Sequence, residues 1–227
     1  MDKPDNTSSH IADQYDRQIR MTIPHYDDIH EEILNFVKVQ CPNPKTWLDT
    51  GCGTGFFIRN AQDVFPETEF FIADPSEGML AKAAQNLEGC RYSLLGRCGT
   101  ADIPATTDHR FDVITAIQCH HYLSREERND AVRACHSLLN DGGFFITSEN
   151  IRPFSEEGIA RSLASWGAFQ RSAGRDEDAV RDHLKRFDHE YFPITVPEHL
   201  QCYRDAGFPV AEILWLSGMQ GVFWCRI

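Results

Sequence analysis

The chain has no long hydrophobic run. No stretch approaches the ~20 consecutive apolar residues that a membrane-spanning helix needs. Residues 1–10 are polar and contain no apolar segment of the kind found in secretory signals. Internal repeats and low-complexity tracts are also missing from the sequence. We therefore expect one globular domain over residues 1–227, located in the cytoplasm and without a membrane partner.

Paired cysteine motifs are missing as well. The eight cysteines are scattered, and no two of them form a CxxC pair. This pattern is typical of free thiols in a reducing compartment. A metal site at Cys119, His120 and His121 is the weaker alternative, because adjacent residues rarely converge on one ion. We expect no metal site.

Positive charge is scarce. The chain has 22 Lys and Arg against 34 Asp and Glu, which gives a formal net charge of −12. A chain this acidic repels phosphate backbones unless a local basic patch overrides the mean charge, and the sequence has no long run of Lys and Arg. Nucleic acid is therefore disfavoured as a partner. The sequence does not fix the oligomeric state, and a homodimer stays open.

The predicted strands alternate with predicted helices. Such alternation favours a parallel sheet covered on both faces. The last two predicted strands are separated by only a few residues, so they form an antiparallel hairpin. The sequence thus predicts an α/β fold: a Rossmann-like, mostly parallel, seven-stranded sheet with helices on both faces and an antiparallel last strand. The seven predicted strands are Thr46–Asp49, Phe70–Ala73, Tyr92–Leu95, Phe111–Ile117, Gly143–Ser148, Ala211–Leu216 and Val222–Ile227.

Two segments lie outside this alternation. Residues 11–40 precede the first strand, and the spacing of their apolar residues predicts helices. Residues 151–190 follow the fifth strand and contain helical patterns but no strand. Open α/β sheets bind ligands at the carboxyl ends of their strands. We therefore interpret 11–40 as a helical segment over a cofactor and 151–190 as a helical cap for an acceptor.

A glycine-rich turn follows the first predicted strand. Gly51, Gly53 and Gly55 alternate with other residues, and Asp49 lies two positions before the first glycine. Glycines at these positions let the backbone turn tightly and approach a ligand. The spacing is GxGxG, whereas nicotinamide enzymes use GxGxxG to admit a pyrophosphate. A carboxylate at Asp49 would repel a pyrophosphate but can receive an ammonium group.

A second carboxylate stands at the end of the second predicted strand. Asp74 follows the glycine-rich turn by roughly twenty residues, where a carboxylate can accept both ribose hydroxyls. The alternative is that Asp74 caps the next helix. Ser76 can take the cap instead, which would leave Asp74 free for a ribose.

Four motifs together carry a family resemblance. LDTGCGTG, FIADPSEGML, FDVITAIQCHHYL and LLNDGGFFITSEN, between residues 47 and 150, resemble the class I S-adenosylmethionine-dependent methyltransferases. The resemblance implies a transferase that binds S-adenosyl-L-methionine. The implied contacts are Gly51, Cys52, Gly53 and Gly55 around the cofactor, Asp49 at its methionine end, Asp74 and Pro75 at the ribose, Thr100, Ala101 or Asp102 at the adenine, and Ala116 and Gln118 beside the sulfonium.

A narrower resemblance concerns two short segments. TIPHY at residues 22–26 and AGF at residues 206–208 are similar to the enzymes that make carboxy-S-adenosylmethionine for tRNA modification. In that family a Tyr at the position of Tyr26 contacts the cofactor. The family also holds the extra carboxylate with an Arg, and the matching position here is near Phe192, where no Arg stands. This difference favours plain methyl transfer.

The sequence offers few candidates for catalysis, because an activated methyl donor needs mainly orientation. His120 and His121 follow the fourth strand and can serve as a base. Glu149 is a second candidate to face the acceptor, and Arg17 or Arg20 could hold the cofactor carboxylate. We expect methyl transfer to a small-molecule acceptor. The alternatives are a carboxy-S-adenosylmethionine synthase-like enzyme, a non-catalytic S-adenosylmethionine-binding protein and, against the glycine spacing, a nicotinamide dehydrogenase.

Overall fold

The structure is a computed structural model that describes residues 14–227. The first residues of the predicted N-terminal segment, 11–13, lie outside the described residues. Within the described residues, seven strands form one sheet in the order β3-β2-β1-β4-β5-β7-β6. The strands are β1 (Thr46–Thr50), β2 (Glu69–Ala73), β3 (Tyr92–Gly96), β4 (Phe111–Ile117), β5 (Leu139–Asn150), β6 (Val210–Ser217) and β7 (Gln220–Arg226).

The pairing of these strands confirms the predicted topology. Strands β1 to β5 pair in parallel, whereas β7 pairs antiparallel with both β5 and β6. The chain therefore has the Rossmann-like, mostly parallel sheet with an antiparallel last strand that the sequence predicts. The carboxyl ends of β1, β2, β4 and β5 meet at one edge of this sheet, which places the glycine-rich turn and residues 118–122 on the same side.

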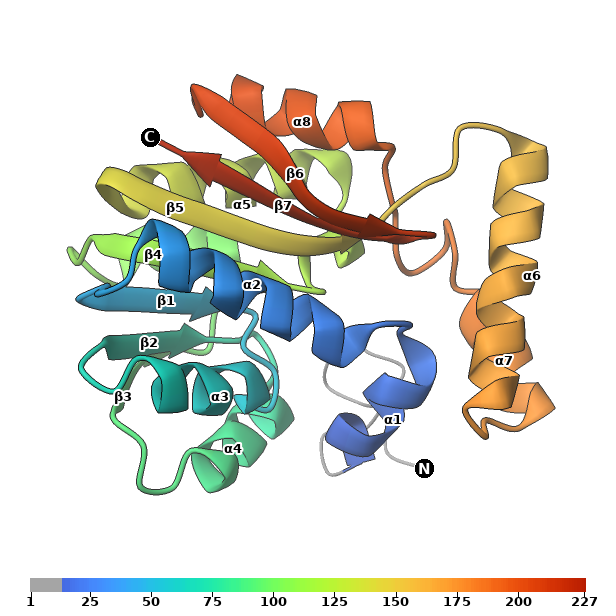
Figure 1. Ribbon diagram of the computed structural model, residues 1–227, viewed down its shortest axis with the longest axis horizontal. Helices are drawn as coiled ribbons and strands as arrows, with labels where there is room; N and C mark the ends of the chain where they lie inside the picture. Colours follow the sequence, from blue (N-terminus) through green and yellow to red (C-terminus); the bar gives the residue numbers. More distant parts are fainter. Residues whose placement is uncertain (1–13) are drawn as a thin grey trace.

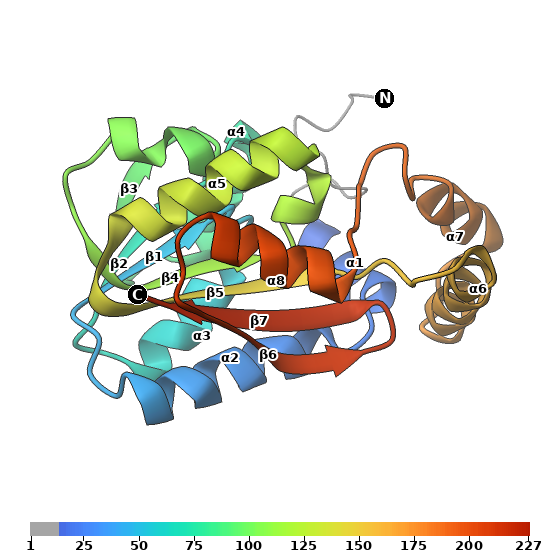
Figure 2. The same cartoon turned by 90° about the horizontal axis from the view of Figure 1, so that it is seen from above.

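Helices cover both faces of the sheet. Figure 2 shows α2 and α3 on one face and α5 and α8 on the other, while α6 and α7 stand beyond the edge toward which β1 and β4 point in Figure 1. The helices are α1 (Tyr15–Thr22), α2 (Tyr26–Gln40), α3 (Phe56–Val64), α4 (Glu77–Asn86), α5 (Arg125–Leu138), α6 (Glu156–Ser172), α7 (Glu177–Leu184) and α8 (Val196–Asp205), with single 3₁₀ turns η2 (Thr100–Ala105) and η3 (His120–Tyr122).

The two faces of the sheet bury separate cores, because successive side chains of a strand point to opposite faces. In β1, Trp47 packs into the core under α2 and α3, and its neighbour Leu48 packs into the core under α5 and α8. The indole N–H of Trp47 donates to the hydroxyl of Thr115 at 3.1 Å, so its polar atom is satisfied inside the core.

Two strands begin two or more residues before their predicted start, whereas the other five begin within one residue of it. Strand β5 begins at Leu139 rather than at Gly143, because Leu139 already pairs with Phe111 and the register shifts before the regular pairing starts. Strand β7 begins at Gln220, which pairs with Ser217 across a tight turn. Both differences lie in turns whose residues were expected to stay outside the ladder.

The core under α5 and α8 provides a test of the fold. Phe145 is fully buried in β5 and stacks on Phe208 with ring centroids 5.9 Å apart. We expect Phe145→Ala to lower the free energy of unfolding by about 3–5 kcal/mol, because truncation leaves a cavity. Ile213→Ala is the control, since Ile213 is 42% exposed on the edge strand, and it should cost less than about 1 kcal/mol. If urea unfolding showed the same loss of unfolding free energy in both variants, this assignment of the core would be contradicted.

Candidate functional site

The glycine-rich turn between β1 and α3 has the backbone that its sequence predicts. Gly51, Gly53 and Gly55 all have positive φ, at 68°, 55° and 72°. A Cβ on Gly51 would lie 2.8 Å from Cβ of Cys119, so packing alone requires glycine there. A Cβ on Gly53 would meet nothing within 4 Å. The backbone at Gly53 is therefore open to close approach by a ligand.

Asp74 holds this turn in place. One carboxylate oxygen of Asp74 accepts a hydrogen bond from the backbone N–H of Gly53 at 2.9 Å, and the other accepts from the backbone N–H of Ser76 at 2.8 Å. Ser76 caps α4 through the N–H of Met79, as predicted. The expectation that Asp74 would be left free is wrong, because it joins the second strand to the glycine turn. A carboxylate oxygen can accept more than one hydrogen bond, so contact of Asp74 with a ribose stays a prediction.

Asp49 is buried at the carboxyl end of β1. Only 3% of the residue is exposed, and one carboxylate oxygen accepts a hydrogen bond from the hydroxyl of Thr115 at 2.7 Å. Burial raises the pKa of Asp49 to about 7, and the bond from Thr115 opposes that shift. A carboxyl group with such a pKa ionises readily when a cation arrives beside it. Asp49 is thus suited to receive an ammonium group.

A small cavity of about 30 Å³ lies against the glycine turn. Asp49 and Gly53 line it together with Tyr15 of α1 and Tyr26 of α2. Pockets that take drug-sized ligands measure roughly 300–1,000 Å³. A nucleoside-bearing cofactor therefore enters this site only if the side chains that cover it move aside.

Helix α1 is tied to the glycine turn by Asp16. The hydroxyl of Thr54 donates to one carboxylate oxygen of Asp16, and the amide of Asn86 donates to the other at 3.1 Å. On the opposite side, the indole N–H of Trp166 donates to the carbonyl of Thr22 at the end of α1, at 2.6 Å. Helix α1 is thus held between the cofactor turn and helix α6.

The end of β4 carries a strained residue. Gln118 has φ of 53°, which is unusual for a residue other than glycine and is found most often at functional sites. Its side-chain amide donates to the hydroxyl of Ser148 and to Oε1 of Gln220, at 3.1 and 3.2 Å. Ala116, two residues earlier, is fully buried. Of these two predicted neighbours of the sulfonium, Gln118 therefore lies at the strand end and Ala116 lies inside the sheet.

The predicted adenine loop divides into two parts. The hydroxyl of Thr100 lies 2.6 Å from the hydroxyl of Thr50 and 3.0 Å from Nε2 of His120, so Thr100 ties the ends of two strands together. Ala101 and Asp102 are exposed. Contact of the adenine with any of these three residues stays a prediction.

The two adjacent histidines occupy different surroundings. His120 is 2% exposed and its ring is bonded to Thr100, while burial lowers its pKa to about 4. His121 is equally buried, and its Nδ1 lies 3.4 Å from Oε2 of Glu149. The other oxygen of Glu149 accepts from the hydroxyl of Thr147 at 2.7 Å. Of the two predicted bases, His121 has the arrangement of a base held by a carboxylate.

Opposing effects set the ionisation of this pair. Burial lowers the pKa of His121, and its contact with Glu149 only partly offsets this. Burial acts to raise the pKa of Glu149, but its contact with His121 and the nearby His120 and His199 together outweigh burial and keep that pKa below its usual range. Near neutral pH the pair is therefore a neutral imidazole beside a carboxylate.

The two arginines suggested for the cofactor carboxylate both lie on α1, and this role stays a prediction. The Nε of Arg20 donates to both oxygens of Asp27 at 3.0 Å, and its guanidinium stacks on Phe56. Arg17 is exposed. His30, which the sequence analysis missed, lines the same cavity as Asp49. The sequence pattern that could have identified His30 is its spacing of four residues from Tyr26 on one helix, which puts both side chains on one face.

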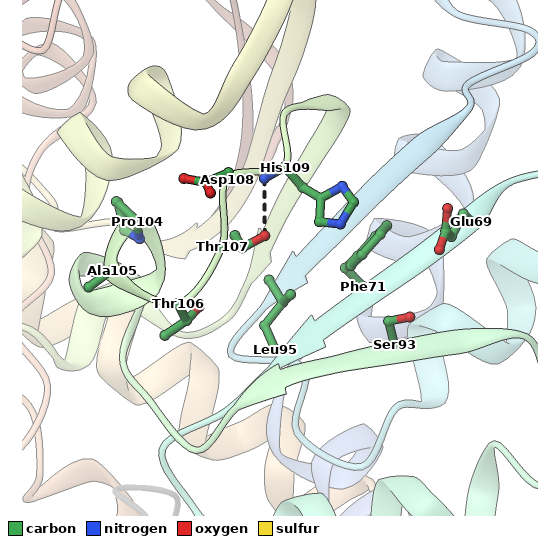
Figure 3. Close-up of a pocket in the computed structure, with 10 residues that line it drawn as sticks. All are labelled: Glu69, Phe71, Ser93, Leu95, Pro104, Ala105, Thr106, Thr107, Asp108 and His109. Carbon is green, nitrogen blue, oxygen red and sulfur yellow. Dashed lines mark hydrogen bonds between the residues drawn. The ribbon is translucent and has the colours of Figure 1, made fainter.

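A larger hollow lies elsewhere in the described residues. Figure 3 shows this cavity of about 760 Å³ between β2, β3 and residues 104–109. Its lining includes Glu69, the first residue of β2, and the rings of Phe71 and His109, which lie 4.9 Å apart. It therefore lies toward the amino ends of the strands and is separate from the glycine turn. Among the described residues, no helix is long and apolar enough to span a bilayer.

The fold and this site define a class of protein: a Rossmann-like α/β enzyme that binds a cofactor over a glycine turn at the carboxyl edge of its sheet. Residues 48–145 match a family model described as a methyltransferase domain. These findings support a class I S-adenosylmethionine-dependent methyltransferase with S-adenosyl-L-methionine as its cofactor.

Among curated relatives, the carboxy-S-adenosyl-L-methionine synthase of Helicobacter hepaticus is 19% identical over 210 residues, which cover 90% of this chain and 87% of the relative. A solved S-adenosylmethionine-dependent methyltransferase from Clostridium acetobutylicum superposes with a TM-score of 0.68 at 16% identity, covering 95% and 97% of the two chains. An O-methyltransferase family protein from Burkholderia thailandensis superposes with a TM-score of 0.65 at 14% identity, covering 97% of this chain. This chain spans 64% of that protein's length.

The described residues fit the cofactor. Its methionine end carries an ammonium and a carboxylate, and Asp49 is a buried carboxyl group beside the turn. Gly53 leaves open space at the backbone, and the Asp74 carboxylate lies directly beside it. Contacts of the cofactor with Cys52, in the glycine turn, and with Pro75, next to Asp74, stay predictions.

The raised pKa of Asp49 predicts a pH-dependent affinity. An ammonium group binds the ionised carboxylate, and with a pKa of about 7 most Asp49 is protonated at pH 6. We expect the dissociation constant of S-adenosylhomocysteine to be about tenfold higher at pH 6 than at pH 8. Calorimetry at both pH values measures this. Asp49→Asn should bind with little pH dependence, and an equally steep dependence in that variant would refute the assignment.

Proposed function

We propose that this enzyme transfers the methyl group of S-adenosyl-L-methionine to a small molecule bound between helix α6 and the β6–β7 turn. His121 takes the acceptor's proton. We also propose that residues 1–227 act as one domain, in which 11–40 covers the cofactor and 151–190 covers the acceptor.

The observation that carries this proposal is a cavity of about 390 Å³ at the carboxyl edge of the sheet. Trp166, Phe169 and Met219 give it apolar surface, while Ser162 and Ser165 give it hydroxyl groups. Its volume lies in the range of small-molecule pockets, and a mostly apolar lining with a few polar groups is typical of them.

Two contacts connect this cavity with the end of β4. Gln220 lines the cavity, and its side-chain oxygen accepts a hydrogen bond from Gln118. The ring of Tyr191 lies 6.2 Å from the rings of both His121 and Trp166. An acceptor in the cavity is therefore next to the strand end at which the cofactor's sulfonium is expected.

The charges of the cap support a small molecule over nucleic acid. Arg161, Arg171 and Arg181 on α6 and α7 each pair with a nearby carboxylate. These pairs leave little positive potential for a phosphate backbone, and the net charge of −12 acts in the same direction.

The pair of His121 and Glu149 supports proton removal from the acceptor. A carboxylate at Nδ1 favours the tautomer with its proton on Nδ1, which leaves Nε2 to accept a proton. When bound, S-adenosyl-L-methionine supplies a methyl group already activated by a positively charged sulfur. The chain then needs to orient the acceptor, exclude water and accept one proton at Nε2 of His121.

A second candidate function comes from the curated relatives, because several are carboxy-S-adenosyl-L-methionine synthases that align with about nine-tenths of this chain. Phe192 stands where that family is expected to place its carboxylate-binding Arg. The backbone of Phe192 is bonded to His121 and Arg128, and its side chain is 38% exposed. We therefore rank this function second, and a non-catalytic cofactor-binding protein third.

A methyl-transfer assay distinguishes these functions. The purified enzyme is incubated with cofactor labelled in its methyl group, and with either a protein-free extract of small metabolites or total tRNA. Label in a small molecule supports the proposal. Label in tRNA overturns the choice of acceptor, and a carboxylated cofactor detected by mass spectrometry supports the second candidate.

The pair also predicts the effect of substitution. We expect His121→Asn to reduce methyl transfer by about 10²–10⁴-fold, the usual contribution of a general base, and Glu149→Gln to reduce it less. Wild-type activity should fall with decreasing pH only below 6.5, the ordinary pKa of histidine, because burial lowers that of His121.

Two controls accompany these variants. His109→Asn, in the exposed loop before β4, should leave activity unchanged, and both active-site variants should bind S-adenosylhomocysteine like the wild type. Unchanged methyl transfer in His121→Asn would exclude His121 as the base.

A further inference from the structure

We propose that His30 is the partner of the cofactor's carboxylate, and that His30 and Asp49 together bind the amino-acid end of S-adenosyl-L-methionine. The inference rests on the cofactor alone and does not depend on which acceptor the enzyme uses.

His30 is a buried polar side chain that lacks a hydrogen-bond partner among the described residues. It is 3% exposed on helix α2, and neither ring nitrogen has a hydrogen-bond partner among residues 14–227. Its neighbours are the rings of Tyr26, Phe56 and Phe57, at centroid distances of 4.5, 6.0 and 5.2 Å. Burying an imidazole without a partner costs free energy that an apolar side chain at this position would avoid.

The position of His30 indicates which ligand group is its partner. His30 and Asp49 line the same small cavity against the glycine turn. Among the described residues that line it, His30 is the one whose side chain can carry a positive charge. The ammonium and carboxylate of the cofactor are attached to the same carbon atom, so their binding groups must lie close together. Asp49 suits the ammonium, and His30 suits the carboxylate.

The protonation state of His30 does not obstruct this role. Burial lowers the pKa of His30 to about 4, so the ring is neutral in the free enzyme near neutral pH. A neutral imidazole still keeps one N–H to donate. Because both nitrogens lack partners, either tautomer can present that N–H to the carboxylate.

The competing explanation is that His30 only fills space in the aromatic cluster. His30→Phe separates the two roles, because a phenyl ring keeps the packing and removes the donor. If His30 binds the carboxylate, the variant should unfold at the same urea concentration as the wild type, or a higher one, and lose affinity for the cofactor. His30→Gln, which keeps a donor, should recover part of that affinity.

Three ligands test the assignment by calorimetry. S-adenosyl-L-methionine carries the ammonium and the carboxylate, its decarboxylated analogue carries only the ammonium, and 5′-methylthioadenosine carries neither. We expect His30→Phe to weaken binding of S-adenosyl-L-methionine about ten- to hundredfold, the size of a hydrogen bond to a charged group. Its affinity for the other two ligands should match that of the wild type. Asp49→Asn should weaken binding of the first two ligands and spare the third.

His199→Phe is the matched control. His199 is also a buried histidine with a nitrogen that lacks a partner in the described chain, but it lies in α8 and does not line the cavity. The affinity of the His199→Phe variant for all three ligands should equal that of the wild type. Equal losses for S-adenosyl-L-methionine and its decarboxylated analogue in His30→Phe would overturn the proposal. So would a wild-type enzyme that binds these two ligands equally well, although cofactor binding itself would then stand.

Discussion

Burial of ionisable groups at the carboxyl edge of the sheet is the constraint on which the site depends. Desolvation disfavours charge, so it raises the pKa of Asp49 to about 7 and lowers that of His30 and of His120 to about 4. These opposite shifts have the same result, because each group is wholly or partly neutral near pH 7. At Asp49, His30 and His120 the free site therefore avoids the cost of isolated buried charges, whereas Glu149 stays ionised in contact with His121. A ligand with its own ammonium and carboxylate supplies the charges that make ionisation favourable.

The sequence predicted those parts of the site that depend on neighbouring residues in the chain. Asp49 and the three glycines follow a strand directly, and Asp74 ends the next strand, so their place at one edge follows from the parallel order alone. The hydrogen bond from the Gly53 N–H to Asp74 joins residues 21 positions apart, and no pattern in the sequence predicts it. The same holds for Thr100, whose bonds to Thr50 and His120 depend on how three strand ends meet.

Pairing between distant elements also decides which histidine faces a carboxylate. The sequence presents His120 and His121 as equals, and it places Glu149 only at the end of a later strand. The 3₁₀ turn at residues 120–122 directs the two rings to different partners, and the adjacency of β4 and β5 brings Glu149 to His121. His30 was missed because a histidine within an amphipathic helix resembles a core residue. Its meaning depends on the cavity, which exists only once α2 packs near the glycine turn.

Helix α1 contacts both the cofactor turn and one wall of the proposed acceptor cavity. Asp16 ties one side of this helix to Thr54 in the glycine turn, and Trp166 of α6 holds its last residues through the carbonyl of Thr22. The cavity beside Asp49 is too small for the cofactor, so the side chains that cover it, Tyr15 of α1 among them, must move aside when the cofactor binds. Trp166 also lines the proposed acceptor cavity, so α1 contacts the walls of both cavities. If cofactor binding changes the affinity for the acceptor through these contacts, thermodynamic reciprocity requires that the acceptor change the affinity for the cofactor by the same factor.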